Sequence, residues 1–511
     1  MMNSFSSTFD RSVWRLLAAV LIPLLFLPFY LAPVWDIDFW WHLAMGRSIL
    51  SLGTIPEFDP LGVYGSFDLR ASTIQNGYWI TQVAYHYVFS NLGANGIIWL
   101  RAALLAGAVS VALIGTLRAK TGWGAILFAS VCMASTMESY SADRPATVSY
   151  LLFSIFLLLL KPESGRTEVW RIFALGLNLV LWANMHGSVA LPALILVMLA
   201  TANVVLRSIP NHKAGRESWR SSLFQSLILL GLAGLSLLSP NHIDLYRSMV
   251  GFEGSELQAR TSEYMTPWAV TSQLGIMLSG YWALLLVSPL AAWGLIIQRR
   301  HSDLLILGLL LLMSLTAYRY VPYFLLGGGP LIALGLHTAV DRGAEKLRAI
   351  APWLLVAAAL TVLSISYPAF EKERFGISET RFPVQATTFL QQDLAGERHV
   401  IFNHYNWGGF LLYQLAGTHQ IFIDGRNFEN ERFAAYTQIL WATPIGQRML
   451  DDWRFSVVVV PEYAMGGERY AIVPYLNAHP EWILAYRDKT AFVFKRSRPP
   501  LTTPVPARPD A

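Results

Sequence analysis

Two carboxylates one residue apart, Asp36 and Asp38, follow a long apolar segment in the stretch WDIDFWWHLAMGR, residues 35–47. Asp38 and His42 are four residues apart, so they share a face if this stretch is helical. Two carboxylates with an imidazole nearby could help to hold a divalent ion such as Mg²⁺ or Mn²⁺. The alternative is that Asp36 only caps the helix that follows. Both interpretations place a short helix directly after an apolar segment.

Other polar side chains stand at the ends of apolar segments that are far apart in the chain. They lie in ESYSADRP (138–145), WANMHGS (182–188), SPNHIDLYR (239–247), SEYMTPW (262–268) and AYRYVPY (317–323). Polar groups at membrane depth are costly, and they mark either a site or a paired structural network. Helix capping and interfacial anchoring by Trp and Tyr explain any single one of these segments equally well.

The composition is that of a membrane protein. Of the 511 residues, 54% are hydrophobic and only 14% are charged, which is unusual for a soluble chain of this size. The net charge of +5 is spread over short loops, which favours membrane topology over nucleic-acid binding. Cys132 is the only cysteine, so an intramolecular disulfide is excluded.

A helix needs roughly 20 apolar residues to cross a hydrocarbon layer of about 30 Å. The sequence predicts eleven such spans, at about 14–34, 95–116, 123–142, 146–161, 171–186, 188–206, 222–239, 273–297, 303–318, 321–338 and 349–368. The first has no clear cleavage site and is expected to be a retained helix, not a signal peptide.

Lysines and arginines in the loops predict the orientation, because cytoplasmic loops are enriched in them. They precede span one and follow spans two, four, six, eight and ten, with Arg118, Arg171, Arg220, Arg300 and Arg348 as examples. These loops all fall on one side, so we expect a multi-pass protein of the cytoplasmic membrane with a cytoplasmic N-terminus. The polar segments, the loop 35–94 and the C-terminal region then lie on the outer side.

The loop 35–94 is expected to hold two helices in the membrane plane, the first starting near Asp38 and the second covering 77–93. The apolar side of the second helix leaves Gln82 and His86 on its other side. Between the two helices, residues 54–70 are rich in Pro and Gly and are typical of a loop.

Charges become frequent after Phe370, and residues 370–496 predict a small extracytoplasmic α/β domain. HVIFN, QIFIDGR and FSVVVVPE are typical of buried strands between helices, and WILAYRDKTAFVFKR of a closing hairpin. In Asn406–Gly409 two glycines open a helix, where they serve either a ligand or packing. Asp424-Gly-Arg426 fits a turn with a local ion pair. The predicted domains are therefore 1–369, 370–496 and a disordered Pro-rich tail, 497–511.

Five motifs together resemble a known class. They are DIDFWWHL (Asp36–Leu43), Arg144-Pro145, WANMHG (Trp182–Gly187), NWGG (Asn406–Gly409) and FIDGR (Phe422–Arg426). The chain resembles the GT-C class of membrane glycosyltransferases, and more closely a group of bacterial membrane proteins that share these motifs. One departure is Asn76-Gly-Tyr-Trp79, where the class pattern has an acid before the tryptophan. Any role of that acid would fall to another residue, such as Glu138 or Glu263.

The resemblance implies a mainly helical GT-C-like fold and transfer of a sugar from a polyprenyl-phosphate-type donor at the outer membrane face. The acceptor would be a protein, a lipid or a polysaccharide. Asp36 or Asp38 would be the catalytic base, with or without a divalent metal on the pair. Binding of the donor phosphate or substrate would fall to His42, Arg144, His186, His242 and Arg319. Arg319, flanked by two tyrosines, is also explained as an interfacial anchor.

Two other functions compete with this one. A transporter or flippase of lipid-linked sugar usually carries charges near the bilayer midplane. Here the charges gather at span ends, with Arg101 inside the second span as the main exception. A non-catalytic assembly partner in cell-envelope glycan synthesis would use the C-terminal domain for docking.

Overall fold

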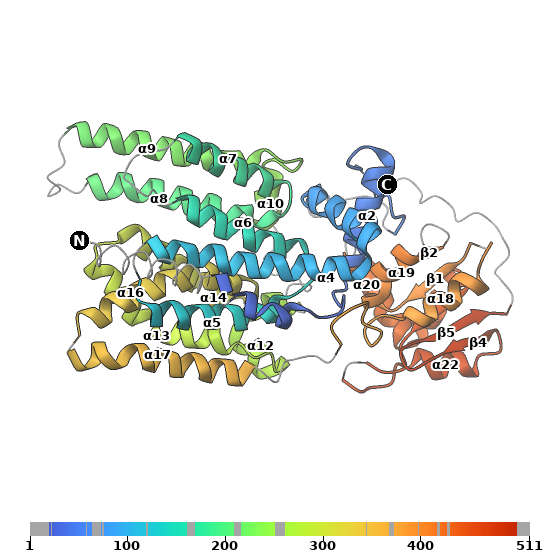
Figure 1. The fold of residues 1–511 in the computed structure, drawn as a ribbon. Helices are drawn as coiled ribbons and strands as arrows, with labels where there is room; N and C mark the ends of the chain where they lie inside the picture. Colours follow the sequence, from blue (N-terminus) through green and yellow to red (C-terminus); the bar gives the residue numbers. More distant parts are fainter. Residues whose placement is uncertain are drawn as a thin grey trace. The chain divides into compact units, whose positions relative to one another are not determined.

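The computed structural model describes residues 20–497 except 22, 58, 64–72, 74–75, 119–120, 161–168, 209–215, 251–260, 344, 367–372, 397, 416–418, 427–429 and 465 (Figure 1). Residues 14–19 of the first predicted span, and the predicted tail beyond Ser497, lie outside this part. By contacts the chain forms two compact units. One contains Met1–Pro33 and Asn95–Phe375, and the other contains Val34–Ala94 and Gly376–Ala511. The domain boundaries inferred from the sequence stay a prediction.

The first unit is a set of long apolar helices, several of which run side by side, as α8 with α9, α13 with α16 and α5 with α17 (Figure 1). Its elements are η1 (Leu27–Tyr30), the C-terminal part of α4 (Trp79–Arg118), α5 (Trp123–Met137), η2 (Glu138–Tyr140), α6 (Pro145–Leu160), α7 (Val169–Ala183), η3 (Gly187–Val189), α8 (Ala190–Ser208), α9 (Arg216–Gly234), η4 (Leu235–Leu237), α10 (Asp244–Val250), η5 (Ser262–Tyr264), α12 (Pro267–Leu274), α13 (Ser279–Ile297), α14 (His301–Thr316), η6 (Tyr318–Tyr320), α15 (Val321–Tyr323), the π-helical η7 (Phe324–Gly328), α16 (Gly329–Asp341) and α17 (Glu345–Ser366).

Six helical segments among the described residues are long and apolar enough to cross a membrane. They are Trp79–Thr116, Gly187–Val205, Arg220–Leu237, Ser279–Ile297, Tyr318–Asp341 and Arg348–Ser366. Three shorter apolar helices, α6, α7 and α14, accompany them. Apolar side chains such as Phe224 of α9 and Leu354 of α17 are exposed, as expected for helices whose solvent is lipid. The chain is a membrane protein, and the number of eleven spans stays a prediction.

Helix α4 is interrupted at Gly93, which has φ 64° and ψ −163°. A side chain would be strained in this conformation, so glycine is the residue that permits it. The interruption separates the segment 77–93, expected in the membrane plane, from the span expected at 95–116. It also falls next to the division of the two units at Ala94 and Asn95.

The second unit combines α2 (Phe39–Leu52) and the start of α4 with a five-stranded sheet of order β2-β1-β3-β5-β4 (Figure 1). The strands are β1 (Val400–Asn403), β2 (Gln420–Ile421), β3 (Val457–Val460), β4 (Trp482–Arg487) and β5 (Phe492–Arg496). The first three are parallel, and β4 and β5 form the antiparallel hairpin that the sequence predicts. The helices are η9 (Tyr405–Trp407), α18 (Val384–Asp393), α19 (Gly408–Gln414), α20 (Asn430–Leu440), α21 (Pro444–Asp452) and α22 (Ile472–Ala478).

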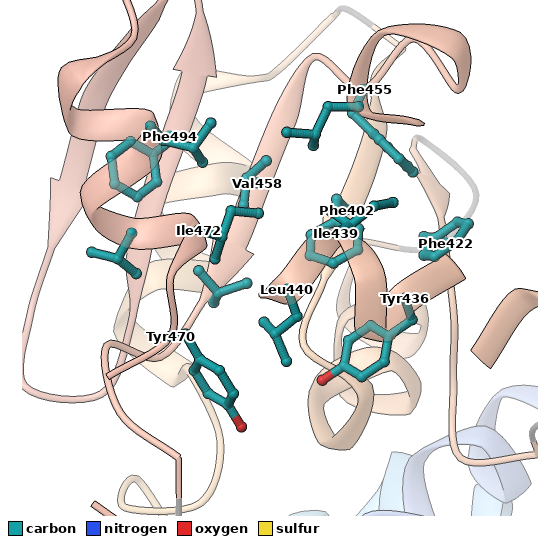
Figure 2. Close-up of a cluster of buried hydrophobic side chains, with 14 of the residues drawn as sticks. Phe402, Phe422, Tyr436, Ile439, Leu440, Phe455, Val458, Tyr470, Ile472 and Phe494 are labelled. Carbon is teal, nitrogen blue, oxygen red and sulfur yellow. The ribbon is translucent and has the colours of Figure 1, made fainter. Parts of the chain in front are cut away.

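One face of this sheet carries an apolar core. Figure 2 shows Ile439 of α20 and Ile472 of α22 among side chains from the strands, such as Phe402 and Val458. Strand β3 is four consecutive valines, and all four are buried. Such a run is typical of a strand that is covered on both faces. The sheet is therefore a rigid support for the loops that follow β1 and β2.

Candidate functional site

The acid pair lies at the start of α2, and its two members have different surroundings. The Asp36 Oδ1 accepts a hydrogen bond from the backbone N–H of Asp38 at 2.8 Å, and Asp36 is buried. This contact orders the turn before the helix, but Asp36 is not the N-cap residue of α2. Asp38 is the N-cap residue of α2, but its side chain forms no capping bond. Its Oδ1 instead accepts from the Trp41 indole N–H at 3.2 Å, and the residue is half-buried.

His42 takes part in a different network. Its Nδ1 lies 3.2 Å from Nε2 of Gln82, a buried residue near the start of α4. The imidazole also packs on the Trp41 ring, with a centroid distance of 3.5 Å, and edge-on to Tyr78 at 5.3 Å. Gln82, noted in the sequence only for its position off the apolar face, is thus a partner of this histidine. These contacts join α2 to α4 and hold the imidazole in place.

The residues of the acid pair do not form a metal centre by themselves. Within the described ranges, no three His, Cys, Asp or Glu side chains are grouped so that they could hold an ion. Mg²⁺ prefers six oxygen ligands in near-ideal geometry, and two carboxylates fill only part of that set. A metal on Asp36 and Asp38 therefore stays a prediction, and no chemical step below depends on it.

The two C-terminal motifs pack directly on the start of α2. A Cβ added to Gly409 of NWGG would lie 3.1 Å from the Ile37 carbonyl oxygen and 3.2 Å from the Trp41 backbone nitrogen. A Cβ added to Gly425 of FIDGR would lie 2.3 Å from Oδ1 of Asp38. Real Cβ atoms do not approach oxygen this closely, so any side chain at position 425 would have to displace the Asp38 carboxylate. The two glycines of NWGG could serve either ligand binding or packing, and the contact of Gly409 with the start of α2 supports packing.

Arg426 follows Gly425 and lies at the centre of a buried ion cluster. Its guanidinium donates to both oxygens of Asp59, at 2.8 and 3.2 Å, and to both oxygens of Asp424, with a shortest contact of 2.6 Å. The side chains of all three residues have no exposed surface. The local Asp424–Arg426 pair was expected from the sequence, whereas Asp59, in the Pro- and Gly-rich loop, carried no signal. The C-terminal turn is thus tied to the segment that follows α2.

In the first unit, three of the polar segments meet. The Tyr318 backbone N–H donates to the Met265 carbonyl at 2.7 Å, and its hydroxyl donates to the Ser139 carbonyl at 2.8 Å. Tyr140 stacks on Tyr318 with ring centroids 4.5 Å apart. The ends of α5, η5 and η6 are therefore held together, although they are far apart in the sequence.

This group of segments carries two of the predicted phosphate-binding residues. Arg144 forms an ion pair with Glu263 of η5. The Arg319 guanidinium lies over the ring of Tyr264, 4.9 Å from its centroid. Glu263, which the sequence offered as a replacement acid, thus lies beside an arginine. The three segments carry two arginines and three carboxylates, Glu138, Asp143 and Glu263, so phosphate binding by the arginines stays a prediction.

Two of the three predicted histidines, His186 and His242, lie in the WANMHGS and SPNHIDLYR segments, and His186 is near enough to Arg319 to interact with its charge. The Asn184 amide donates to the Leu238 carbonyl at 2.7 Å, which joins the two segments. His186 Nδ1 lies 2.6 Å from the Ser188 hydroxyl. His242 is exposed, has a positive φ of 42°, and its Nδ1 lies 3.1 Å from the Leu237 carbonyl oxygen. Each histidine therefore has a local polar contact, and a role in binding stays a prediction for both.

Arg101, the charged residue inside a span, has buried partners. Its guanidinium donates to both oxygens of Asp143, at 2.9 and 3.0 Å, and both side chains are almost fully buried. It also donates to the carbonyl oxygens of Tyr30, at 3.3 Å, and of Ala32. Arg101 therefore holds the chain segment that precedes the acid pair against α4 and the loop after η2.

His404, next to the NWGG motif, predicts a pH-dependent stability of the sheet domain. Its Nδ1 has no hydrogen-bond partner, and the ring packs against Trp407 and Tyr470. Burial lowers the pKa of His404 to about 4. In the unfolded chain His404 binds a proton below about pH 6.5, whereas in the folded domain it binds one only below about pH 4. The free energy of unfolding therefore falls as the pH falls from 6.5 to 4.

Between pH 7.5 and 5.0 this histidine should cost the domain about 2 kcal/mol. The measurement is amide hydrogen exchange of β1 and β3 in the full-length protein in detergent. The matched control is His404→Phe, which keeps a ring but cannot titrate. An equal loss of protection in both proteins would show that other groups cause the pH dependence.

No protein-family model and no curated protein sequence matches the chain. Comparison with solved structures shows that the chain shares its fold with an archaeal oligosaccharyltransferase. The chain is similar to the Archaeoglobus fulgidus oligosaccharyltransferase in its apo form, with a TM-score of 0.61 and 13% identity, over 95% of this chain and 74% of that one. A structure of that protein in complex with Zn and sulfate has a TM-score of 0.57 at 13% identity, over 88% and 67% of the two chains.

A third structure, in which that protein is tethered to an acceptor peptide, has a TM-score of 0.58 at 11% identity and the same coverage as the apo form. At these identities the likeness is one of fold. The expectation of a mainly helical fold with a small C-terminal sheet, like that of the oligosaccharyltransferase, is confirmed. The narrower bacterial group, defined by its motifs, stays a prediction.

Proposed function

We propose that the protein is a membrane glycosyltransferase that moves a sugar from a polyprenyl-phosphate-type donor to an acceptor at the outer face of the cytoplasmic membrane. The observation that carries the proposal is a carboxylate, Asp38, held in a fixed position in a chain that shares the oligosaccharyltransferase fold over 95% of its length. That enzyme has been captured with an acceptor peptide. In the proposed reaction this chain also transfers to an acceptor, which is a protein, a lipid or a polysaccharide.

Asp38 is the residue that we assign as the base. In the proposed step an acceptor hydroxyl attacks the anomeric carbon, so a new carbon–oxygen bond forms as its proton passes to the carboxylate. Asp36 is less suited, because it is buried and accepts the N–H that starts the helix turn. Asp38 is half-buried and does not cap the helix. A carboxylate that is already fixed loses little conformational entropy when it takes up the reacting geometry.

The bond that breaks joins the anomeric carbon to a phosphate oxygen, and its electron pair leaves with the lipid phosphate. Cationic donors stabilise such a leaving group. We assign this role to Arg144 and Arg319, since arginine offers a fork that matches phosphate oxygens. The pair of Arg144 with Glu263 shows that this guanidinium already binds an oxyanion. His42, His186 and His242 are further candidates for contacts to the substrate.

A transporter is the weaker alternative. Its main support in the sequence was a charge inside a span, Arg101, and this charge is satisfied by Asp143 and two carbonyl groups. Buried paired charges of this kind serve a structural network as well as a transport path. The assembly-partner hypothesis makes a different prediction, namely that no single carboxylate is needed for activity.

The test is mass spectrometry of polyprenyl-linked sugars in cells that lack the gene and in the same cells complemented with the wild type. We expect one lipid-linked sugar to accumulate in the deletion strain and to return to its normal level on complementation. The accumulated species identifies the donor. An unchanged lipid pool together with an unchanged envelope glycan would contradict the proposal and favour the assembly partner.

A further inference from the structure

The Asp424-Gly425-Arg426 turn contacts the carboxylate that we assign as the base. Gly425 approaches Oδ1 of Asp38 so closely that an added Cβ would lie 2.3 Å away, and 3.8 Å from the Trp41 ring. The Trp41 N–H donates to the same oxygen at 3.2 Å. Oδ1 is therefore enclosed by the indole and the glycine, and this fixes the rotation of the carboxylate.

The turn itself is held in place by several independent contacts. The Arg426 backbone N–H donates to Oδ1 of Asp424 at 2.9 Å, and the Tyr405 hydroxyl donates to the Gly425 carbonyl at 3.1 Å. The Arg426 guanidinium donates hydrogen bonds to Asp59 and to Asp424. Asp59 in turn accepts from the backbone N–H groups of Leu61 and Val63, both at 3.1 Å. Charge-assisted, bidentate contacts of this kind restrict position strongly.

We propose that Gly425 and Arg426 are positioning residues for Asp38, with the buried Asp59–Arg426–Asp424 cluster fixing the turn that Gly425 presents to the carboxylate. The inference rests on the proposed function and goes beyond it, since neither residue itself takes or gives a proton in the proposed step. It also assigns a role to the FIDGR motif, although the acid pair, Asp36 and Asp38, lies almost 400 residues earlier in the chain. The motif orients the base.

Gly425→Ala is the direct test, because the methyl group must push Asp38 aside. A displacement of about 1 Å can lower a rate about 100-fold. We expect kcat to fall by that factor with KM unchanged. The control is Gly466→Ala in the same unit, where an added Cβ meets nothing within 4 Å. The assay mixes full-length protein in detergent with membranes of the deletion strain and follows the loss of the accumulated lipid-linked sugar.

A second measurement needs no activity. Protein labelled with 5-fluorotryptophan gives a ¹⁹F resonance for Trp41, which Trp41→Phe identifies by its absence. We expect this resonance to shift in Gly425→Ala and in Asp38→Asn, and to stay in place in Gly466→Ala.

The outcomes separate the inference from the proposed function. If Asp38→Asn is inactive while Gly425→Ala keeps the wild-type rate, the positioning role is wrong and the function stands. If Asp38→Asn itself keeps the wild-type rate, the assignment of Asp38 as the base in the proposed function is wrong. Should Gly425→Ala not fold, Asp59→Asn carries the test, because it weakens the buried cluster without touching Asp38. A wild-type rate and an unshifted Trp41 resonance in that variant would overturn the inference.

Discussion

Asp38→Asn is expected to lower the rate of glycosyl transfer by about 10²–10⁴-fold, the usual contribution of a positioned base. The amide keeps the shape of the side chain, and its oxygen can still accept from the Trp41 N–H. What it loses is the ability to take the proton of the acceptor. The measurement is the rate at which purified full-length protein consumes the lipid-linked sugar of deletion-strain membranes, with the protein level matched to the wild type.

The control for this substitution is Asp36→Asn. An amide oxygen at position 36 can still accept from the Asp38 backbone N–H. A neutral hydrogen bond that replaces a charged one changes a free energy by about 1 kcal/mol, so the rate should stay within about tenfold of the wild type. The reverse pattern, with Asp36→Asn inactive and Asp38→Asn active, would exchange the two roles. Full activity in the double variant would remove the base from the pair altogether.

Local patterns predicted the secondary structure of the second unit well. The apolar runs around Val400 and Val457 gave β1 and β3, and WILAYRDKTAFVFKR gave the β4–β5 hairpin, whereas QIFIDGR forms a strand only at Gln420–Ile421. The segment expected in the membrane plane, 77–93, ends at the interruption of α4. These signals depend only on neighbours within a few residues, so one sequence carries them.

The partners of the buried charges could not be predicted in the same way. Asp59 and Arg426 are 367 residues apart in the sequence. Nothing in the periodicity of either segment points to the other, because a pairing of this kind depends on how whole elements pack. The Asp143 partner of Arg101 is a similar case, although its position beside Arg144 in a polar segment was a clue.

The prediction that Asp38 and His42 share a face depends on where the helix begins. Four-residue spacing places two residues on one face of a helix, and the His42 backbone N–H does lie 3.3 Å from the Asp38 carbonyl. The helix begins at Phe39, however, so Asp38 is at the N-cap and its side chain turns to Trp41. His42 faces Gln82 instead. The four-residue spacing predicted the shared helix face, but the position of the helix start determined which residue the Asp38 side chain contacts.

The second large effect is expected for Arg101→Met. This change removes the arginine partner of Asp143 in a buried site and the donor to the Tyr30 and Ala32 carbonyls. Breaking a buried pair from one side costs about 3–5 kcal/mol. We expect a large fall in the thermal unfolding midpoint of the full-length protein in detergent, and less folded protein in membranes.

The double variant Arg101→Met/Asp143→Leu separates structure from transport. With both charges gone, the apolar pair should recover most of the lost stability, and only about 1 kcal/mol for the unsatisfied carbonyls should remain. A glycosyltransferase in which Arg101 only holds the segment before the acid pair should regain activity along with stability. A transporter that moves its substrate past Arg101 should regain stability but not function. A double variant no more stable than Arg101→Met would show that the carbonyl contacts, and not the ion pair, are what the arginine supplies.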